Sequence, residues 1–171
     1  MMVDFSKFNW EEIFGVVVAT DGLKRNQTRG LRTEIQEIAT AKYSGEQFKY
    51  VGMSENGRDY VDVFGSYWED KGQLNMFPTN SNKTKVFTLK NFQGNRTEYV
   101  KTFDYILLKD TKAMSVGWTD WDSVYKNIKI KDATIESYVN YDDLHMIDFF
   151  VKPSEKQDLS TALTNIIESI I

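Results

Sequence analysis

Two short strands around a glycine turn are predicted by the stretch Arg58-Asp59-Tyr60-Val61-Asp62-Val63-Phe64-Gly65-Ser66-Tyr67-Trp68-Glu69-Asp70-Lys71. The first strand carries Asp59 and Asp62, and the second carries Glu69 and Lys71. One residue separates Glu69 from Lys71, so on a strand their side chains point to the same face. The stretch therefore predicts a hairpin that gathers acidic side chains and a lysine on one face.

The turn decides which aspartate joins Glu69 and Lys71. Asp59 and Asp62 are three positions apart, so on a regular strand they point to opposite faces. A two-residue turn at Phe64-Gly65 would put Asp62 on the face of Glu69, and a β-bulge would reverse this. The residues alone leave both aspartates as candidates.

Two carboxylates and a lysine on neighbouring strands suit the hydrolysis of a phosphodiester. Carboxylates hold Mg²⁺, which can bridge to a phosphate oxygen and lower the pKa of a bound water. A lysine on the same face can orient that water and offset negative charge. The alternative is that these side chains are surface charges of an exposed hairpin. A second pattern in the chain, Asp104 with Asp110-Thr111-Lys112, has its second acid in an expected turn, so we favour the first pattern.

The rest of the chain predicts a single α/β domain with a mixed central β-sheet flanked by helices. Apolar side chains at helical spacing predict helices over residues 6–19, with Ser6 as a cap, over residues 31–43, and from residue 154 or 158 to the C-terminus. A short helix is expected over residues 119–125. Strands are expected over residues 47–53, 84–91, 105–108, 113–118 and 134–139, the last as an edge strand. This gives N-terminal helices over residues 1–45, a catalytic sheet core over residues 46–130, and the edge strand and C-terminal helix over residues 131–171.

Composition excludes several kinds of site. The 171 residues are 41% hydrophobic and 14% aromatic, which is typical of a globular domain with its own core. The absence of cysteine excludes disulfides and thiolate chemistry. The single histidine, His145, excludes a site built from several histidines, and we expect it to pack or lie on the surface. The N-terminal segment predicts neither a signal peptide nor a membrane span, so we expect a cytoplasmic protein.

Charge is distributed unevenly along the chain. The net charge is −4, yet residues 81–101 hold four lysines and one arginine against one glutamate, which gives 5 − 1 = +4 over 21 residues. A basic segment on an acidic protein suits a partner such as nucleic acid that is bound in one cleft. Ordinary solvated lysines on a strand are the alternative.

The order of these motifs resembles the catalytic core of type II restriction endonucleases of the PD-(D/E)XK superfamily. The resemblance covers roughly residues 30–130. It rests on Asp59-Tyr60-Val61-Asp62, on Gly65 and on Trp68-Glu69-Asp70-Lys71, followed by a basic strand and an apolar strand. The nine residues between Asp59 and Glu69 are similar to the spacing in blunt-cutting members. The proline that precedes the first acid in the family is absent.

The resemblance implies a Mg²⁺-dependent endonuclease that cuts double-stranded DNA at specific sequences, works as a homodimer and leaves 5′-phosphates. Glu69 and one aspartate, Asp59 by its spacing or else Asp62, would bind the metal, and Lys71 would act on the attacking water. Glu34 matches the position of an extra acid in some relatives, although an exposed helix charge is the alternative. Contacts to DNA are expected from Lys83, Lys85, Lys90, Asn91 and Gln93.

Other functions remain open at this point. A repair, nicking or transposition nuclease would use the same chemistry, and a non-enzymatic β-rich binding protein would use none of it. The apolar stripe of the C-terminal helix is expected to pack in the core, or to form a dimer face if it is too wide for one subunit to cover. Its members are Leu159, Leu163, Ile166, Ile167 and Ile170.

Overall fold

In the computed structural model, the chain divides into two compact units, each with its own apolar core. The first unit contains Met1–Tyr67 and Asp148–Ile171, and the second contains Trp68–Ile147. The structure describes residues 2–20, 23, 29–52, 58–73, 75–77, 80–90, 101–131, 134–149 and 158–170.

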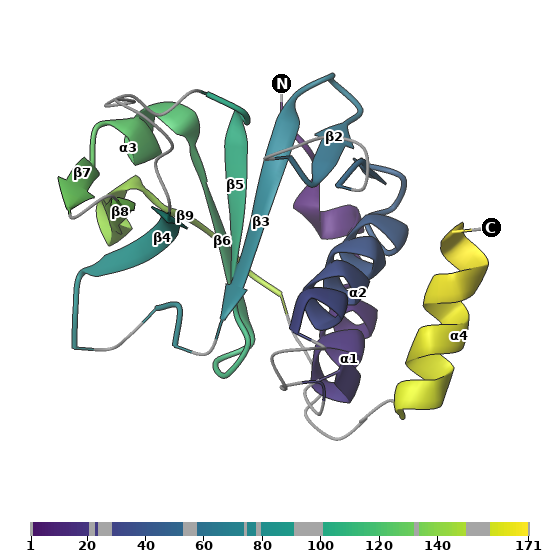
Figure 1. The fold of residues 1–171 in the computed structure, drawn as a ribbon. Helices are drawn as coiled ribbons and strands as arrows, with labels where there is room; N and C mark the ends of the chain where they lie inside the picture. Colours follow the sequence, from purple (N-terminus) through teal and green to yellow (C-terminus); the bar gives the residue numbers. More distant parts are fainter. Residues whose placement is uncertain are drawn as a thin grey trace. The chain divides into compact units, whose positions relative to one another are not determined.

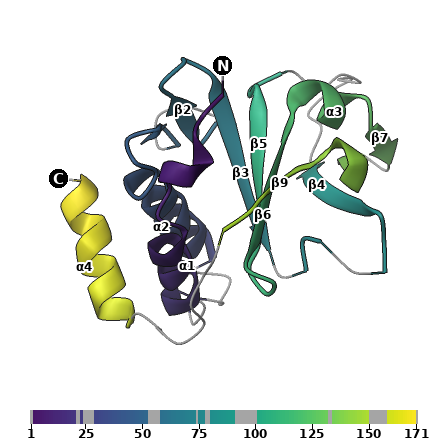
Figure 2. The same cartoon turned by 180° about the vertical axis from the view of Figure 1, so that it is seen from behind.

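Helices dominate the first unit. After a short 3₁₀ turn, η1 (Phe5–Lys7), the chain forms α1 (Trp10–Ala19), α2 (Arg29–Lys42) and, at its C-terminal end, α4 (Leu159–Ile170). These helices lie side by side in both views of the ribbon (Figure 1, Figure 2). They enclose a buried cluster made of Val16, Ala19, Ile35, Ile38, Ala39, Ala162 and Ile166. The helices predicted at both ends of the chain are therefore confirmed, and they share one core.

Local hydrogen bonds set the helix starts. The Asn9 side chain accepts a hydrogen bond from the Glu12 N–H at 3.2 Å, so α1 begins at Trp10 and not near Ser6 as predicted. Ser6 instead lies in η1. Asp158 accepts from the Thr161 N–H at 2.9 Å, which caps α4.

One residue of the predicted C-terminal stripe does not lie on the buried face. Ala162 and Ile166 are buried and Leu163 packs partly against the same cluster, but Ile167 is 54% exposed. Consecutive residues are rotated by about 100° around the helix axis, and of these two only Ile166 faces the core. The expected packing of the stripe in the core is therefore confirmed for Ile166 and not for Ile167.

A small antiparallel pair completes the first unit. Strand β1 (Phe48–Tyr50) pairs with β2 (Tyr60–Asp62), with Phe48 opposite Asp62. The rings of Phe48 and Tyr60 stack with their centroids 4.8 Å apart.

The second unit contains two sheets. In one, β3 (Tyr67–Gln73) runs parallel to β5 (Tyr105–Asp110), and β5 is followed by antiparallel neighbours β6 (Ser115–Asp120) and β9 (His145–Ile147). Figure 1 shows β3, β5 and β6 side by side. The other sheet has the order β4 (Lys83–Lys90), β8 (Thr134–Asn140) and β7 (Ile128–Lys131). Residues 134–140 thus form a middle strand and not the predicted edge strand.

The two sheets of the second unit share a core with helix α3 (Trp121–Tyr125), which the Asp120 side chain caps through the Ser123 N–H at 2.8 Å. Its buried members are Met76, Val86, Phe103, Ile106, Leu108, Trp121, Val124 and Val139. Because one sheet contains both parallel and antiparallel pairs and helices accompany it, the prediction of a mixed α/β fold is confirmed.

Substitutions of two neighbouring residues on α4 test which face of this helix is buried. We expect Ile166→Ala to lower the free energy of unfolding by about 2–5 kcal/mol, because the side chain is 2% exposed and its removal leaves a cavity. Ile167→Ala should change it by less than about 0.5 kcal/mol, since that side chain is mostly in solvent. Urea unfolding followed by circular dichroism measures both values. Equal losses would show that the assigned face is wrong.

Candidate active site

Strand β3 brings Glu69 and Lys71 together on one face. The Lys71 Nζ lies 3.5 Å from the Glu69 Oε1, with the side chains 42% and 15% exposed respectively. The alternate residues Trp68 and Asp70 are buried. Glu69 and Lys71 lie opposite Ile106 and Leu108 of β5, on the face that also carries the core of the second unit. The predicted pairing of this carboxylate and this ammonium is therefore observed at the rim of an apolar core.

Asp62 serves the turn that follows β2. Its Oδ1 accepts hydrogen bonds from the N–H groups of Phe64 at 2.8 Å and Ser66 at 3.0 Å. Its backbone N–H donates to the Ser66 carbonyl at 2.9 Å, and its carbonyl accepts from the Gly65 N–H at 3.0 Å. Gly65 has a φ of 83°, which is the left-handed conformation that glycine adopts without strain. This is a three-residue hairpin loop with a glycine bulge, and not the two-residue turn that would favour Asp62 as a ligand.

Asp59 belongs to an acidic group around the Tyr50 hydroxyl in the first unit. Burial raises the pKa of Tyr50 well above its usual range, and the neighbouring carboxylates of Glu37, Glu34 and Asp59 raise it further. A Cβ added at Gly52 would lie 2.8 Å from the Tyr50 ring, so glycine at this position leaves room for the ring. Glu34 is half-buried and close to this group, and is not simply an exposed helix charge.

The sequence interpretation missed Tyr50 and Glu37. The signal that could have found Glu37 is its spacing of three residues from Glu34, because residues with this spacing lie on one face of a helix. Nothing in the sequence marks Tyr50, since its environment depends on α2 and on the chain before β2. Within the described residues, no three acidic or histidine side chains lie close enough together to hold a metal ion. A metal would therefore need fewer protein ligands and several waters, as Mg²⁺ commonly has.

The competing pattern around Asp110 is a structural turn. Asp110 is buried, and its Oδ1 accepts from the N–H groups of Lys112 at 3.0 Å and Ala113 at 2.9 Å. Its Oδ2 accepts from the Phe77 N–H at 3.0 Å. Asp104 forms a separate surface ion pair with Lys101 at 3.2 Å. These bonds account for both acids, so the preference for the Glu69 and Lys71 pattern is kept.

The predicted DNA-contact residues fall partly outside the described chain. Lys83 and Lys85 are exposed on β4, while Thr84 and Val86 between and after them point into the core. The Lys85 Nζ lies 3.2 Å from the Glu136 Oε1 and near the Tyr138 ring, and the hydrogen bond to Glu136 raises the pKa of Lys85. Lys90 lies opposite Thr134 on β8. Asn91 and Gln93 lie outside the described residues.

Trp118 and His145 pack against each other, which agrees with the expectation that His145 packs or lies on the surface. Their rings stack with centroids 4.2 Å apart, and Trp118 also meets Tyr105 at 5.6 Å.

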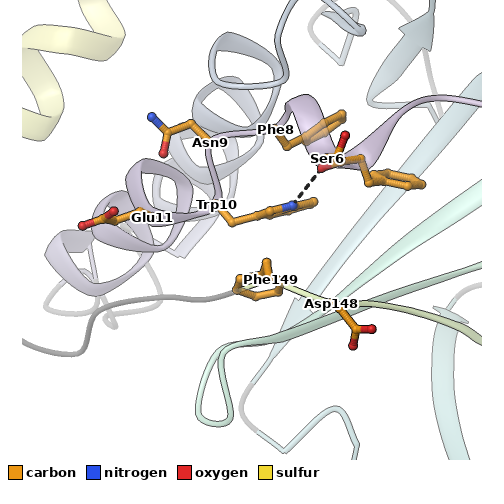
Figure 3. Close-up of a pocket in the computed structure, with 8 residues that line it drawn as sticks. Ser6, Phe8, Asn9, Trp10, Glu11, Asp148 and Phe149 are labelled. Atoms are coloured by element: carbon orange, nitrogen blue, oxygen red, sulfur yellow. Dashed lines mark hydrogen bonds between the residues drawn. The ribbon is translucent and has the colours of Figure 1, made fainter.

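An open pocket of about 340 Å³ lies in the first unit. Figure 3 shows the Trp10 ring between Phe8 and Phe149, with ring centroids 5.0 and 5.3 Å away. The Trp10 Nε1 donates to the Phe5 carbonyl at 3.2 Å. The pocket is lined by Phe5, Ser6, Phe8, Asn9, Trp10, Glu11, Asp148 and Phe149, so it contains none of the predicted site residues.

No protein-family model matches this sequence, and a search of curated proteins returns no match. No helix in the described part of the chain is long and apolar enough to cross a membrane.

The raised pKa of Tyr50 predicts a pH dependence of stability. The unfolded chain ionises its tyrosines near pH 10, whereas folded Tyr50 keeps its proton to higher pH, so above pH 10 the unfolded state binds fewer protons. The free energy of unfolding should therefore fall as pH rises past 10. Tyr50→Phe should remove this part of the decline between pH 9 and pH 11 in urea unfolding. Tyr125→Phe, at an exposed position on α3, should decline like the wild type. A Tyr50→Phe curve parallel to the wild type would contradict the assignment.

Proposed function

We propose that this protein is a Mg²⁺-dependent endonuclease that cuts double-stranded DNA at specific sequences. The observation that carries the proposal is the Glu69–Lys71 pair, which puts a carboxylate and an ammonium 3.5 Å apart on one face of β3. Phosphodiester hydrolysis needs a carboxylate for the metal and a cation beside the attacking water, and this strand supplies both. The resemblance of residues 58–71 to PD-(D/E)XK nucleases supports the same assignment.

The turn after β2 favours Asp59 over Asp62 as the second metal-binding carboxylate. Asp62 and Ser66 form a hydrogen-bonded pair across the three-residue loop, and the Asp62 carboxylate is occupied by turn N–H groups. Asp59 keeps the nine-residue spacing to Glu69 on which the resemblance to the nuclease family rests.

In the proposed reaction, Asp59 and Glu69 would hold Mg²⁺ through their carboxylate oxygens. When bound, the ion would polarise a phosphate oxygen and lower the pKa of a water ligand. Lys71 would orient the attacking water and offset the negative charge that develops on the phosphoryl oxygens. Attack in line with the leaving 3′ oxygen breaks the P–O3′ bond, so the products carry a 5′-phosphate and a 3′-hydroxyl.

DNA binding is proposed to involve the basic residues of β4 and the segment after it. Lys83 and Lys85 point away from the core of the second unit, so they would contact phosphates beyond the scissile one. Lys90 would do the same, and Asn91 and Gln93 would contact base edges. A homodimer would let one subunit act on each strand of a palindromic site.

Neutral substitutions of Glu69 and Lys71 test the proposed site. We expect Glu69→Gln and Lys71→Met to lower the Mg²⁺-dependent cleavage of a sequenced plasmid at least about 100-fold, because each removes a charge that acts on the metal or the transition state. Both variants should keep the wild-type free energy of unfolding to within about 0.5 kcal/mol in urea unfolding, since the two side chains are partly exposed. Omitting Mg²⁺ or adding a chelator should abolish cleavage by the wild type.

A matched surface ion pair supplies the control. Lys126→Met and Asp143→Asn break a surface ion pair of similar length, 3.1 Å, outside the proposed site and the basic segment, and should leave cleavage unchanged. Asp62→Asn keeps an oxygen that can accept the turn hydrogen bonds, so it should stay active, while Asp59→Asn should not. Full activity of Glu69→Gln would overturn the site. In the plasmid digest, discrete fragments from the wild type support a sequence-specific endonuclease. Nicked circles indicate a nicking enzyme instead. Intact plasmid overturns the proposal.

A further inference from the structure

A fully buried ion pair lies on the other side of β3 from Glu69 and Lys71. The Lys109 Nζ of β5 lies 3.0 Å from the Asp70 Oδ2 of β3, and the two side chains are 2% and 3% exposed. Both residues belong to the second unit. Lysine and aspartate are rarely buried to this extent, and when they are, each requires a partner of opposite charge.

The lysine side chain runs past Gly72 to reach its partner. Lys109 is the register partner of Gly72, while Asp70 pairs with Leu107, so the ion pair runs diagonally between the strands. A Cβ added at Gly72 would lie 3.8 Å from both the Cβ and the Cε of Lys109. The aliphatic part of Lys109 therefore runs along Gly72 to Asp70. A shift of β3 by one residue would turn Asp70 to the other face of the sheet.

Such a pair adds little net stability. Removing two charges from water costs several kcal/mol, and well-packed apolar residues at buried positions are often as stable or more stable. What a buried pair can supply is specificity, because every register except one leaves a buried charge without its partner. Strand β3 needs a contact that fixes its register on β5. Strands β3 and β5 are parallel and are joined by a long segment that contains β4, so no tight turn fixes their register.

We propose that the Asp70–Lys109 ion pair is a positioning pair that fixes the register of β3 on β5 and thereby holds Glu69 and Lys71 on the reacting face. Neighbouring residues of β3 have different roles: Asp70 fixes the register of the strand through Lys109, and Glu69 and Lys71 carry the chemistry. The structural part of this inference stands without any enzymatic activity, and its catalytic meaning rests on the function proposed above.

Charge removal in pairs separates positioning from stability. Asp70→Asn or Lys109→Met alone leaves one buried charge and should lower the urea midpoint. The double variant Asp70→Leu/Lys109→Met removes both charges and should recover a midpoint near that of the wild type. In that variant we expect amide hydrogen exchange over Glu69–Gln73 to accelerate at least about 10-fold while amides of β6 keep their protection, because only β3 loses its lock.

Cleavage kinetics provide the second readout. The stable double variant should lose at least about 10-fold in kcat with KM for DNA unchanged, and Lys109→Arg, which keeps the charge, should retain more activity than Lys109→Met. Wild-type exchange in β3 together with wild-type kcat in the double variant would overturn the positioning role. If the double variant does not fold, Lys109→Arg is compared with Lys109→Met. Equal rates of amide hydrogen exchange over β3 in these two variants would overturn the positioning role. A wild type that cuts no DNA refutes the proposed nuclease and leaves the exchange test standing.

Discussion

Over four consecutive residues, strand β3 has to bury two side chains and keep the two that alternate with them partly exposed to solvent. Trp68 and Asp70 are buried, while Glu69 and Lys71 reach the rim of the core. Strand alternation makes this possible, but only in one register, because a slip of one residue exchanges the two faces. A slip would put Glu69 and Lys71 on the face of the buried Lys109, and would move Trp68 and Asp70 to the opposite face. The rest of the second unit is arranged around this constraint, with β5 supplying both the apolar neighbours on one face and Lys109 on the other.

Carboxylates in this chain divide into two kinds according to their hydrogen bonds. Asp62 and Asp110 are buried and accept backbone N–H groups at turns, so their charge is used to hold local structure. Glu69 faces a lysine ammonium at partly exposed positions, and Asp59 lies near the Tyr50 hydroxyl with Glu34 and Glu37. A carboxylate that already accepts two or three N–H groups has few lone pairs left for a metal. Hydrogen bonds to backbone N–H groups therefore identify Asp62 and Asp110 as structural residues, which the sequence spacing alone did not.

Several features could be predicted from the sequence because they depend on neighbours along the chain. Helical spacing of apolar residues located α1, α2 and α4, and alternation placed Glu69 and Lys71 on one face. The predictions were wrong where one tertiary or capping contact determines the start of a helix, the place of a strand in its sheet or the direction of a side chain. Asn9 rather than Ser6 begins α1, because its side chain reaches the Glu12 N–H. Residues 134–140 form a middle strand because residues 128–131 pair with them as β7. No local sequence pattern predicted this pairing. Ile167 faces outward because α4 packs through Ala162 and Ile166.

The sequence by itself determined the mixed α/β class, the hairpin with its central glycine, and the shared face of Glu69 and Lys71, since strand and helix periodicity are properties of the local backbone. It left open which aspartate belongs with them. Tertiary structure supplied what depends on distant partners: the three-residue loop that occupies Asp62, the acids gathered around Tyr50, and the burial of Lys109 beside Asp70. Those features require residues far apart in the chain to meet, and the energies that bring them together come from packing and desolvation, which no short stretch of sequence contains.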